Sequence, residues 1–173
     1  MRRQTTVNAL AALGALGVSV LFAASIKTDY DHAADFSHYK TYSWMKVDAG
    51  DSLWADRITR DVDEQLAAKG LTKVASGGDL GVSAFGATHN QQSVETFYNG
   101  FGGWRWRGFG DATSEVINTP VGTLLVDLFD GQSKHLVWRS NSSETLSGSP
   151  EKNDKKLEHD VADMFKHFPP ERR

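Results

Sequence analysis

The chain has 173 residues, of which 39% are hydrophobic and 24% charged, with a formal net charge of -3 at pH 7 and no cysteine. This length fits one ordinary domain rather than two. The lack of cysteine excludes disulfides, thiol nucleophiles and thiolate metal sites, and the slightly acidic balance argues against binding to nucleic acid through an overall positive field.

Residues 1–25 predict an export signal. Arg2 and Arg3 come before an apolar stretch, and no further charge occurs until Lys27. The most apolar part, residues 9–24, would be about 24 Å long as a helix, which is shorter than the bilayer core of about 30 Å. We therefore expect a cleaved signal rather than a permanent transmembrane helix.

The small residues Ala23 and Ser25 favour cleavage between Ser25 and Ile26. The sequence of residues 22–25, FAAS, is also similar to a bacterial lipobox in which Ser25 stands in place of the lipid-bearing cysteine. A hydroxyl cannot replace the thiol in that reaction, so release into the periplasm or retention by an uncleaved signal is expected. A simpler interpretation of residues 22–25 stays open, because small residues also cluster near cleavage sites of ordinary signals. Separately, Arg2 and Arg3 could belong to a twin-arginine signal, although a basic pair is common at the start of other signals.

Residues 26–173 are expected to form a single domain that begins with a strand and a helix. Residues 36–47 alternate and are rich in aromatic residues, which is typical of a strand. Asp51 or Ser52 can cap a helix that ends at Gly70, with Leu71 placed for a Schellman contact. The apolar stripe of this helix consists of Trp54, Ile58, Val62 and Leu66.

The central region predicts further strands, at residues 71–75, 80–88, 93–98, 114–118, 122–129 and 135–141. Pro120 is expected at an edge or bend, and a turn beginning at Asp130 and Gly131 is expected to join the last two strands as a hairpin.

Ser149 and Pro150 then begin a second helix, which Pro169 and Pro170 stop. Its apolar stripe consists of Leu157, Val161, Met164, Phe165 and Phe168. The predicted fold class is α+β: a two-layer domain with a mostly antiparallel sheet of about six strands and two amphipathic helices packed on it.

Three stretches carry a resemblance to a known family. They are TDYDHAADFSHYKTYSW, GTLLVDLFDGQSKHLVWRSNSSETL and SPEKNDKKLEHDVADMFKHFPP, and together they span nearly all of residues 26–173. The chain resembles the bacterial envelope family known as domain of unknown function 4136, many of whose members look like lipoproteins. The resemblance implies a place in the periplasm or at the outer membrane, but no activity and no catalytic residue. Ser25 departs from the lipidated cysteine and leaves membrane association open.

One segment has a composition that packing alone does not require. It runs from Tyr98 to Phe109, overlaps a glycine-rich stretch at residues 99–111, NGFGGWRWRGFGD, that predicts a loop or an irregular hairpin tip, and carries aromatic and arginine side chains. Such side chains can stack on sugars or bases and bind carboxylates or phosphates. The alternative is that the tryptophans pack on the sheet and the arginines extend into solvent. The candidate binding residues are Tyr98, Phe101, Trp104, Arg105, Trp106, Arg107 and Phe109.

Other charged groups have simpler interpretations. His159, Asp163 and His167 recur every four residues and could hold a metal, although a solvated helix face gives the same pattern. A second, weaker cluster of metal-ligating residue types falls in an expected polar linker and consists of Asp29, Asp31, His32, Asp35 and His38. Asp127 is expected to form a cross-strand ion pair with Arg139, and Asp130 to serve the turn.

These observations favour an exported, non-enzymatic binding or structural module of the envelope of a Gram-negative bacterium. We expect no catalytic residue and no cofactor, because no catalytic motif occurs. The expected partner is an envelope component or another protein, not nucleic acid. Two alternatives stay open: a metal-dependent or hydrolytic envelope enzyme, and a structural protein anchored in the membrane by its signal.

Overall fold

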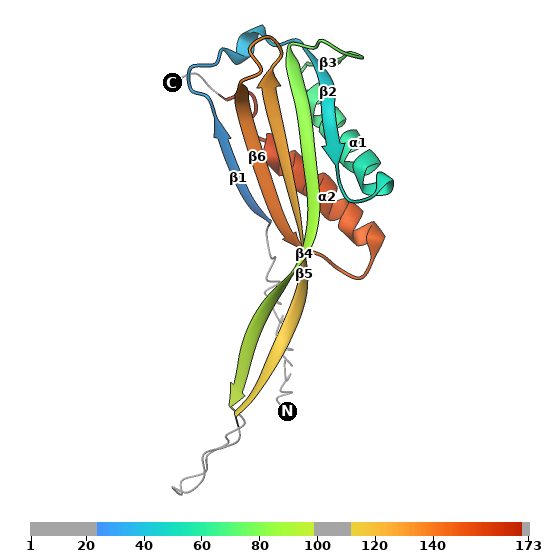
Figure 1. Ribbon diagram of the computed structural model, residues 1–173, viewed down its shortest axis with the longest axis vertical. Coiled ribbons are helices and arrows are strands. Elements are labelled where there is room, and N and C mark those ends of the chain that lie inside the picture. Colours follow the sequence, from blue (N-terminus) through green and yellow to red (C-terminus); the bar gives the residue numbers. More distant parts are fainter. Residues whose placement is uncertain (1–23, 99–111, 171–173) are drawn as a thin grey trace, which may run out of the picture.

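The computed structural model describes residues 24–98 and 112–170, with only the backbone described at 94–98 and 112–115 (Figure 1). Its six-stranded sheet has the order β1-β6-β5-β4-β2-β3. The strands are β1 (Ser25–Tyr30), β2 (Thr41–Asp48), β3 (Thr72–Lys73), β4 (Leu80–Tyr98), β5 (Ala112–Asp130) and β6 (Leu136–Thr145). Three pairings are antiparallel, whereas β2 runs parallel to both β3 and β4. The predicted α+β class is confirmed.

Helices α1 (Ser52–Ala68) and α2 (Pro150–Phe165) pack side by side on one face of the sheet (Figure 1). Asp51 caps α1 by accepting the backbone N–H of Trp54 at 2.9 Å. At the other end Gly70 has φ +86°, and Leu71 donates its N–H to the carbonyl of Leu66 at 3.0 Å, which completes the predicted Schellman motif. Ser149 caps α2 through the N–H of Lys152, as predicted.

The core lies between the helices and this face of the sheet. Both predicted helix stripes point into it, except that Trp54 is only half-buried, and they meet Leu80, Val82, Val126, Leu128 and Trp138. Asp63 ties α1 to the strands beside it: its carboxylate accepts hydrogen bonds from the Tyr42 hydroxyl and the Trp44 indole, both at 2.8 Å. The two helices and five of the six strands therefore form one packed body, to which β3 adds a short edge.

Beyond this body, β4 and β5 continue as a two-stranded arm (Figure 1). The last β6 pairing is at Val121, and the nine successive pairs from Asn90↔Pro120 to Tyr98↔Ala112 have no other strand of residues 24–98 and 112–170 beside them. At about 3.3 Å per residue, this arm is about 30 Å long. Pro120 fits at its base because the carbonyl of Pro120 faces the chain after β6, so its missing N–H removes no bond to β4.

The structure corrects several predicted boundaries. Residues 36–47 do not form one strand: a 3-10 helix, η1 (Phe36–His38), capped by Asp35, precedes β2. The pairs predicted at 80–88 with 93–98, and at 114–118 with 122–129, are each one continuous strand. The strand expected at 71–75 is reduced to Thr72–Lys73, since only these residues pair with β2.

The segment expected to be a polar linker is also ordered. β1 is an edge strand on β6, and Asp29 lies opposite Arg139 within that pairing. Asp31 then donates its N–H to the carbonyl of Val137, and Asp35 accepts the N–H of Ser37. The Asp31 side chain accepts the N–H of Ala33, so the Asp31 and Asp35 carboxylates serve local turns and caps.

Gly78 provides a test of how closely β2 and the start of β4 approach. A Cβ atom on Gly78 would lie 2.5 Å from the Tyr42 carbonyl carbon and 2.6 Å from the Ser43 nitrogen. We expect Gly78→Ala to lower the free energy of unfolding by about 2 kcal/mol, because two backbones would have to separate. Gly148 has open space around it, so Gly148→Ala is the matched control and should change stability by less than about 0.5 kcal/mol. Urea denaturation of both variants measures this, and equal stabilities would contradict the packing described.

Candidate functional site

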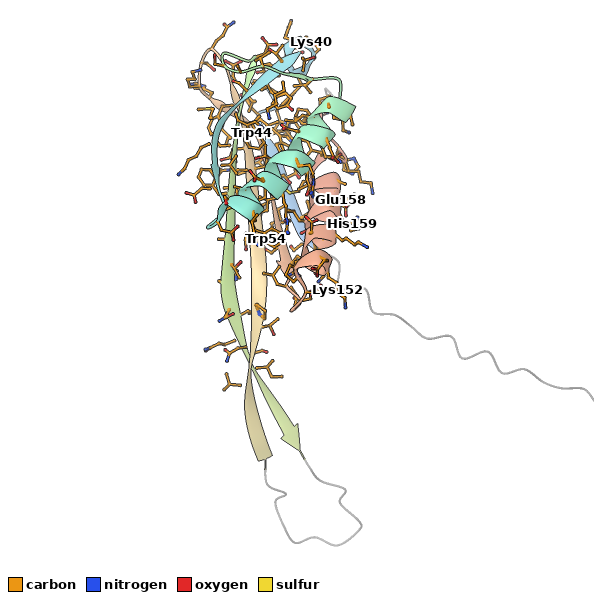
Figure 2. The ribbon with its side chains drawn as sticks, turned by 90° about the vertical axis from the view of Figure 1, so that its right-hand side faces the viewer. Lys40, Trp44, Trp54, Lys152, Glu158 and His159 are labelled. Carbon is orange, nitrogen blue, oxygen red and sulfur yellow. The ribbon has the colours of Figure 1, made fainter. Side chains whose placement is uncertain are left out.

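A pocket of about 300 Å³ lies between the sheet and the first turns of both helices. β2 ends opposite Phe85 and leads into α1, and β6 ends opposite Val121 and leads into α2, so both helices begin where the arm leaves the body. Figure 2 shows Trp54 and Lys152 at these helix beginnings, at the same end of the body. The pocket therefore opens beside the base of the arm.

Small residues on the sheet form the hollow. A Cβ atom on Gly86 would lie 3.0 Å from Ile58 Cδ1, and one on Gly122 would lie 2.9 Å from Leu146 Cδ2. Because these two residues have no side chain, Ile58 of α1 and Leu146 of the link after β6 can lie close to the sheet. The space between Ile58 and Leu146 is not filled by side chains from positions 86 and 122. Apolar side chains line much of the pocket: Trp54, Ile58, Leu124, Leu146 and Leu157.

One wall of the pocket is charged. Lys156 of α2 donates to Glu144 of β6 and to the carbonyl of Thr145, both at 2.6 Å. Asp160, one turn further along α2, also lines the pocket and is only 6% exposed. Burial raises the pKa of Asp160 to about 6, and the nearby Glu144 carboxylate adds to this, although a hydrogen bond with Ser142 opposes it.

The rim beside this wall is held by a local network. The Asn153 side chain accepts the N–H of Ser147 at 2.8 Å and donates to the carbonyl of Ser147 at 2.9 Å. The link between β6 and α2 is therefore fixed by the first turn of the helix that follows it. The pocket is formed by hydrogen-bonded backbone rather than by an unsupported loop.

A second buried carboxylate, Asp61, lies on α1 outside this pocket. Its Oδ1 atom accepts the Arg60 guanidinium at 2.8 Å, while its Oδ2 atom is buried and has no hydrogen-bond partner among the described residues. Burial raises the pKa of Asp61. Arg60 also reaches Asp154 of α2 at 3.1 Å, so this group serves the contact between the two helices.

The predicted ion pair between Asp127 and Arg139 is confirmed. The two residues lie opposite each other on β5 and β6, and two hydrogen bonds of 2.6 Å join the guanidinium to both carboxylate oxygens. Asp127 is 3% exposed, and the pairing raises the pKa of Arg139. The turn role of Asp130 is also confirmed: its Oδ1 atom accepts the N–H groups of Gln132 and Ser133, and these bonds lower its pKa to about 2.

The three predicted metal ligands do not form a joint site. His159 and Asp163 lie on the exposed side of α2, with 3.8 Å between the His159 Nε2 and Asp163 Oδ2 atoms, and α2 ends before His167. His159 points away from the sheet in Figure 2, and its side chain is 79% exposed. Within residues 24–98 and 112–170, no group of three or more histidine or acidic side chains is placed to hold a metal ion.

Of the predicted binding residues, the structure describes only the backbone of Tyr98. The other predicted binding residues lie outside the described residues: Phe101, Trp104, Arg105, Trp106, Arg107 and Phe109. Most of the predicted signal also lies outside them. Tyr98 is the last residue of β4, and its backbone pairs with Ala112. The segment is thus attached at the far end of the arm.

One pocket residue that the sequence analysis missed, Asp160, could have been found from the sequence pattern. Asp160 lies three residues after Leu157 and four before Met164, so an acidic residue stands within the apolar stripe of α2. No sequence pattern indicates Glu144 and Lys156 as pocket residues, because their pairing depends on how α2 packs against β6.

The raised pKa of Asp160 predicts how stability depends on pH. Since its folded pKa is about 6 and its ordinary value is 3.8, its contribution to stability is fully present below pH about 4 and is lost as the pH rises through about 6. The loss is up to about 3 kcal/mol. Asp61 acts with the same sign, whereas Asp130 loses its contribution only toward pH about 2.

We therefore expect the free energy of unfolding to fall between pH 4 and pH 7, and Asp160→Asn to make this fall smaller. At pH 7.5 the variant should be more stable than the original chain, because the amide carries no charge and can keep a hydrogen bond with Ser142. Urea denaturation across this pH range measures both effects. The same pH slope in both proteins would contradict the burial of Asp160.

The fold is similar to that of several proteins of known structure, whereas the comparison with curated proteins gave no match. A PDZ domain protein from Parabacteroides distasonis superimposes with a TM-score of 0.60 at 17% identity; the match covers 88% of this chain but only 37% of that one. PelC from Paraburkholderia phytofirmans, solved as a dodecamer, has a TM-score of 0.51 at 12% identity, with 82% of this chain and 94% of that chain covered. These similarities support the fold.

Among the helices in the described part of the chain, none is both long and apolar enough to cross a membrane. The model of the family Domain of unknown function (DUF4136) matches residues 26–170, which is nearly the whole chain. The expectation drawn from the sequence is confirmed: the chain belongs to the DUF4136 family.

Proposed function

We propose that the chain is an exported, non-enzymatic binding module of the cell envelope of a Gram-negative bacterium, which contacts its partner through the far end of the β4–β5 arm. The observation that carries this proposal is the arm itself, which extends about 30 Å beyond the packed body. Export is supported by the character of residues 1–25 and by a family match that begins at residue 26.

The arm is difficult to explain as part of the body. A two-stranded ribbon is marginally stable by itself, and no other strand of the described residues pairs with either outer edge of this one. The described side chains on it are largely exposed, including those of residues 90–93 and Val116, which is 56% exposed. A partner that covers the arm would satisfy these backbone groups and bury the apolar side chains.

The composition at the end of the arm indicates what that partner is. Residues 99–111 combine aromatic side chains with Arg105 and Arg107, in a chain that is acidic overall. Aromatic faces stack on sugar rings, and guanidinium groups form paired hydrogen bonds with carboxylates and phosphates. These properties favour an envelope glycan, an anionic lipid headgroup or an acidic protein surface.

The first experiment replaces Trp104 and Trp106 with Ala and Arg105 and Arg107 with Ser. We expect this variant to lose its retention on isolated cell envelopes, because the stacking and anion-binding groups are removed together. Its melting temperature should not change, since the segment is attached about 30 Å from the packed body. Co-sedimentation and a thermal melt measure the two properties.

The matched control is Lys152→Ser with Lys155→Ser, which removes two positive charges from exposed positions on α2. This control should remain bound. The proposed contact surface is wrong if the loop variant still sediments with envelopes, or if the lysine variant is released equally, because retention would then depend on overall charge.

The second experiment tests export. Mass spectrometry of the protein isolated from the periplasmic fraction should give a chain that starts at Ile26, because small residues precede that position. A mass that includes Met1 would show that the signal is retained and would favour an anchored structural protein. A mass larger than the sequence allows would show a modification.

A further inference from the structure

The pocket beside the base of the arm has a volume equal to that of about ten water molecules. It is distinct from the proposed contact surface at the far end of the arm. Leu124 from β5, Leu146 from the link after β6 and Leu157 from α2 line it with apolar surface. Pockets of this kind commonly take the apolar part of a small molecule, and a few polar groups then fix its orientation.

The charges around the pocket do not balance when Asp160 is ionised. Glu144 and Asp160 contribute two carboxylates, and Lys156 contributes one ammonium group. Lys156 already makes two 2.6 Å hydrogen bonds, to Glu144 and to the Thr145 carbonyl. No lysine or arginine of the described chain forms an ion pair with Asp160, whose hydrogen-bond partner is Ser142.

An uncompensated carboxylate this well buried is costly, and a cation placed against it would recover that cost. A ligand ammonium would gain a charge-assisted hydrogen bond with a carboxylate that is only 6% exposed. An anionic ligand would instead meet two carboxylates and a lysine that is already paired. A neutral apolar ligand would leave Asp160 without compensation.

We propose that this pocket binds a small amphipathic amine, whose ammonium group pairs with Asp160 and whose hydrocarbon part lies against Leu124, Leu146 and Leu157. The binding site is then formed by the walls that two helices and the sheet already provide. Asp160 gains a binding role, which explains why a carboxyl group stands within the apolar stripe of α2.

Three probes of similar size separate the charge requirement from the apolar one. These are 2-phenylethylamine, the neutral 2-phenylethanol and the anionic 3-phenylpropionate, each titrated into the purified protein at pH 7.5 by isothermal titration calorimetry. We expect the amine to bind at least tenfold more tightly than the alcohol, and the acid to bind more weakly than both. Equal affinity for amine and alcohol would overturn the proposal.

Two variants locate the charge effect. Asp160→Asn should lower the affinity for the amine at least tenfold and leave the affinity for the alcohol unchanged. Glu158→Gln is the matched control, because it removes one carboxylate from an exposed position of the same helix, and it should bind the amine as the original chain does. Retained amine preference in Asp160→Asn, or the same loss in Glu158→Gln, would overturn the assignment.

The pH profile gives an independent measurement. The preference for amine over alcohol should decline as the pH falls through about 6, where Asp160 takes up a proton. The charged groups around Asp160 are Glu144 from β6 and Lys156, His159 and Asp163 from α2, while α1 contributes Trp54 and Ile58 to the pocket wall. A preference that does not change between pH 7.5 and pH 5 would contradict the pairing.

Discussion

The unbroken antiparallel pairing of β4 with β5 is the constraint on which the rest of the structure depends. Nineteen residue pairs join the two strands, from Leu80↔Asp130 to Tyr98↔Ala112. Their neighbours are shorter: β2 is paired only up to Phe85, and β6 only up to Val121. Both helices begin just after these neighbours end. The length difference between the central pair and its neighbours therefore produces both the arm and the pocket.

This arrangement also explains why the pocket and arm lie together. The chain must leave the sheet where β2 and β6 stop, and the links that follow carry Ala49 on one side and Leu146 on the other. Gly86 and Gly122 lie on the two central strands at this level, and their missing side chains keep the site open. A ligand here would contact the strands that continue directly into the arm. The pocket and the arm are thus joined by two hydrogen-bonded strands rather than by a flexible link.

The sequence predicted those features that depend on local chemistry. The caps at Asp51 and Ser149 and the Schellman motif at Gly70 follow from neighbouring residues, and the Asp127–Arg139 pair follows from one hairpin. The continuity of β4 could not be predicted, because His89, Asn90 and Gln91 have little preference for strands and are held there by pairing with β5. Similarly, β1 is polar and becomes a strand only because β6 offers an open edge. Four separate segments of the chain line the pocket, so the sequence alone could not predict it. Its one indication in the sequence is Asp160, an acidic residue within the apolar stripe of α2.

The two buried acidic residues of the helices show why that sign is informative. Asp61 and Asp160 both interrupt an apolar stripe, and burial raises the pKa of each. Asp61 has the Arg60 guanidinium beside it, and Arg60 also binds Asp154 on the neighbouring helix, so packing between α1 and α2 accounts for it. Asp160 has a serine hydroxyl and an open pocket instead. Asp160 has no guanidinium among its partners in the described residues, so the structural role that explains Asp61 does not extend to Asp160. A ligand cation provides the compensation that Arg60 provides for Asp61.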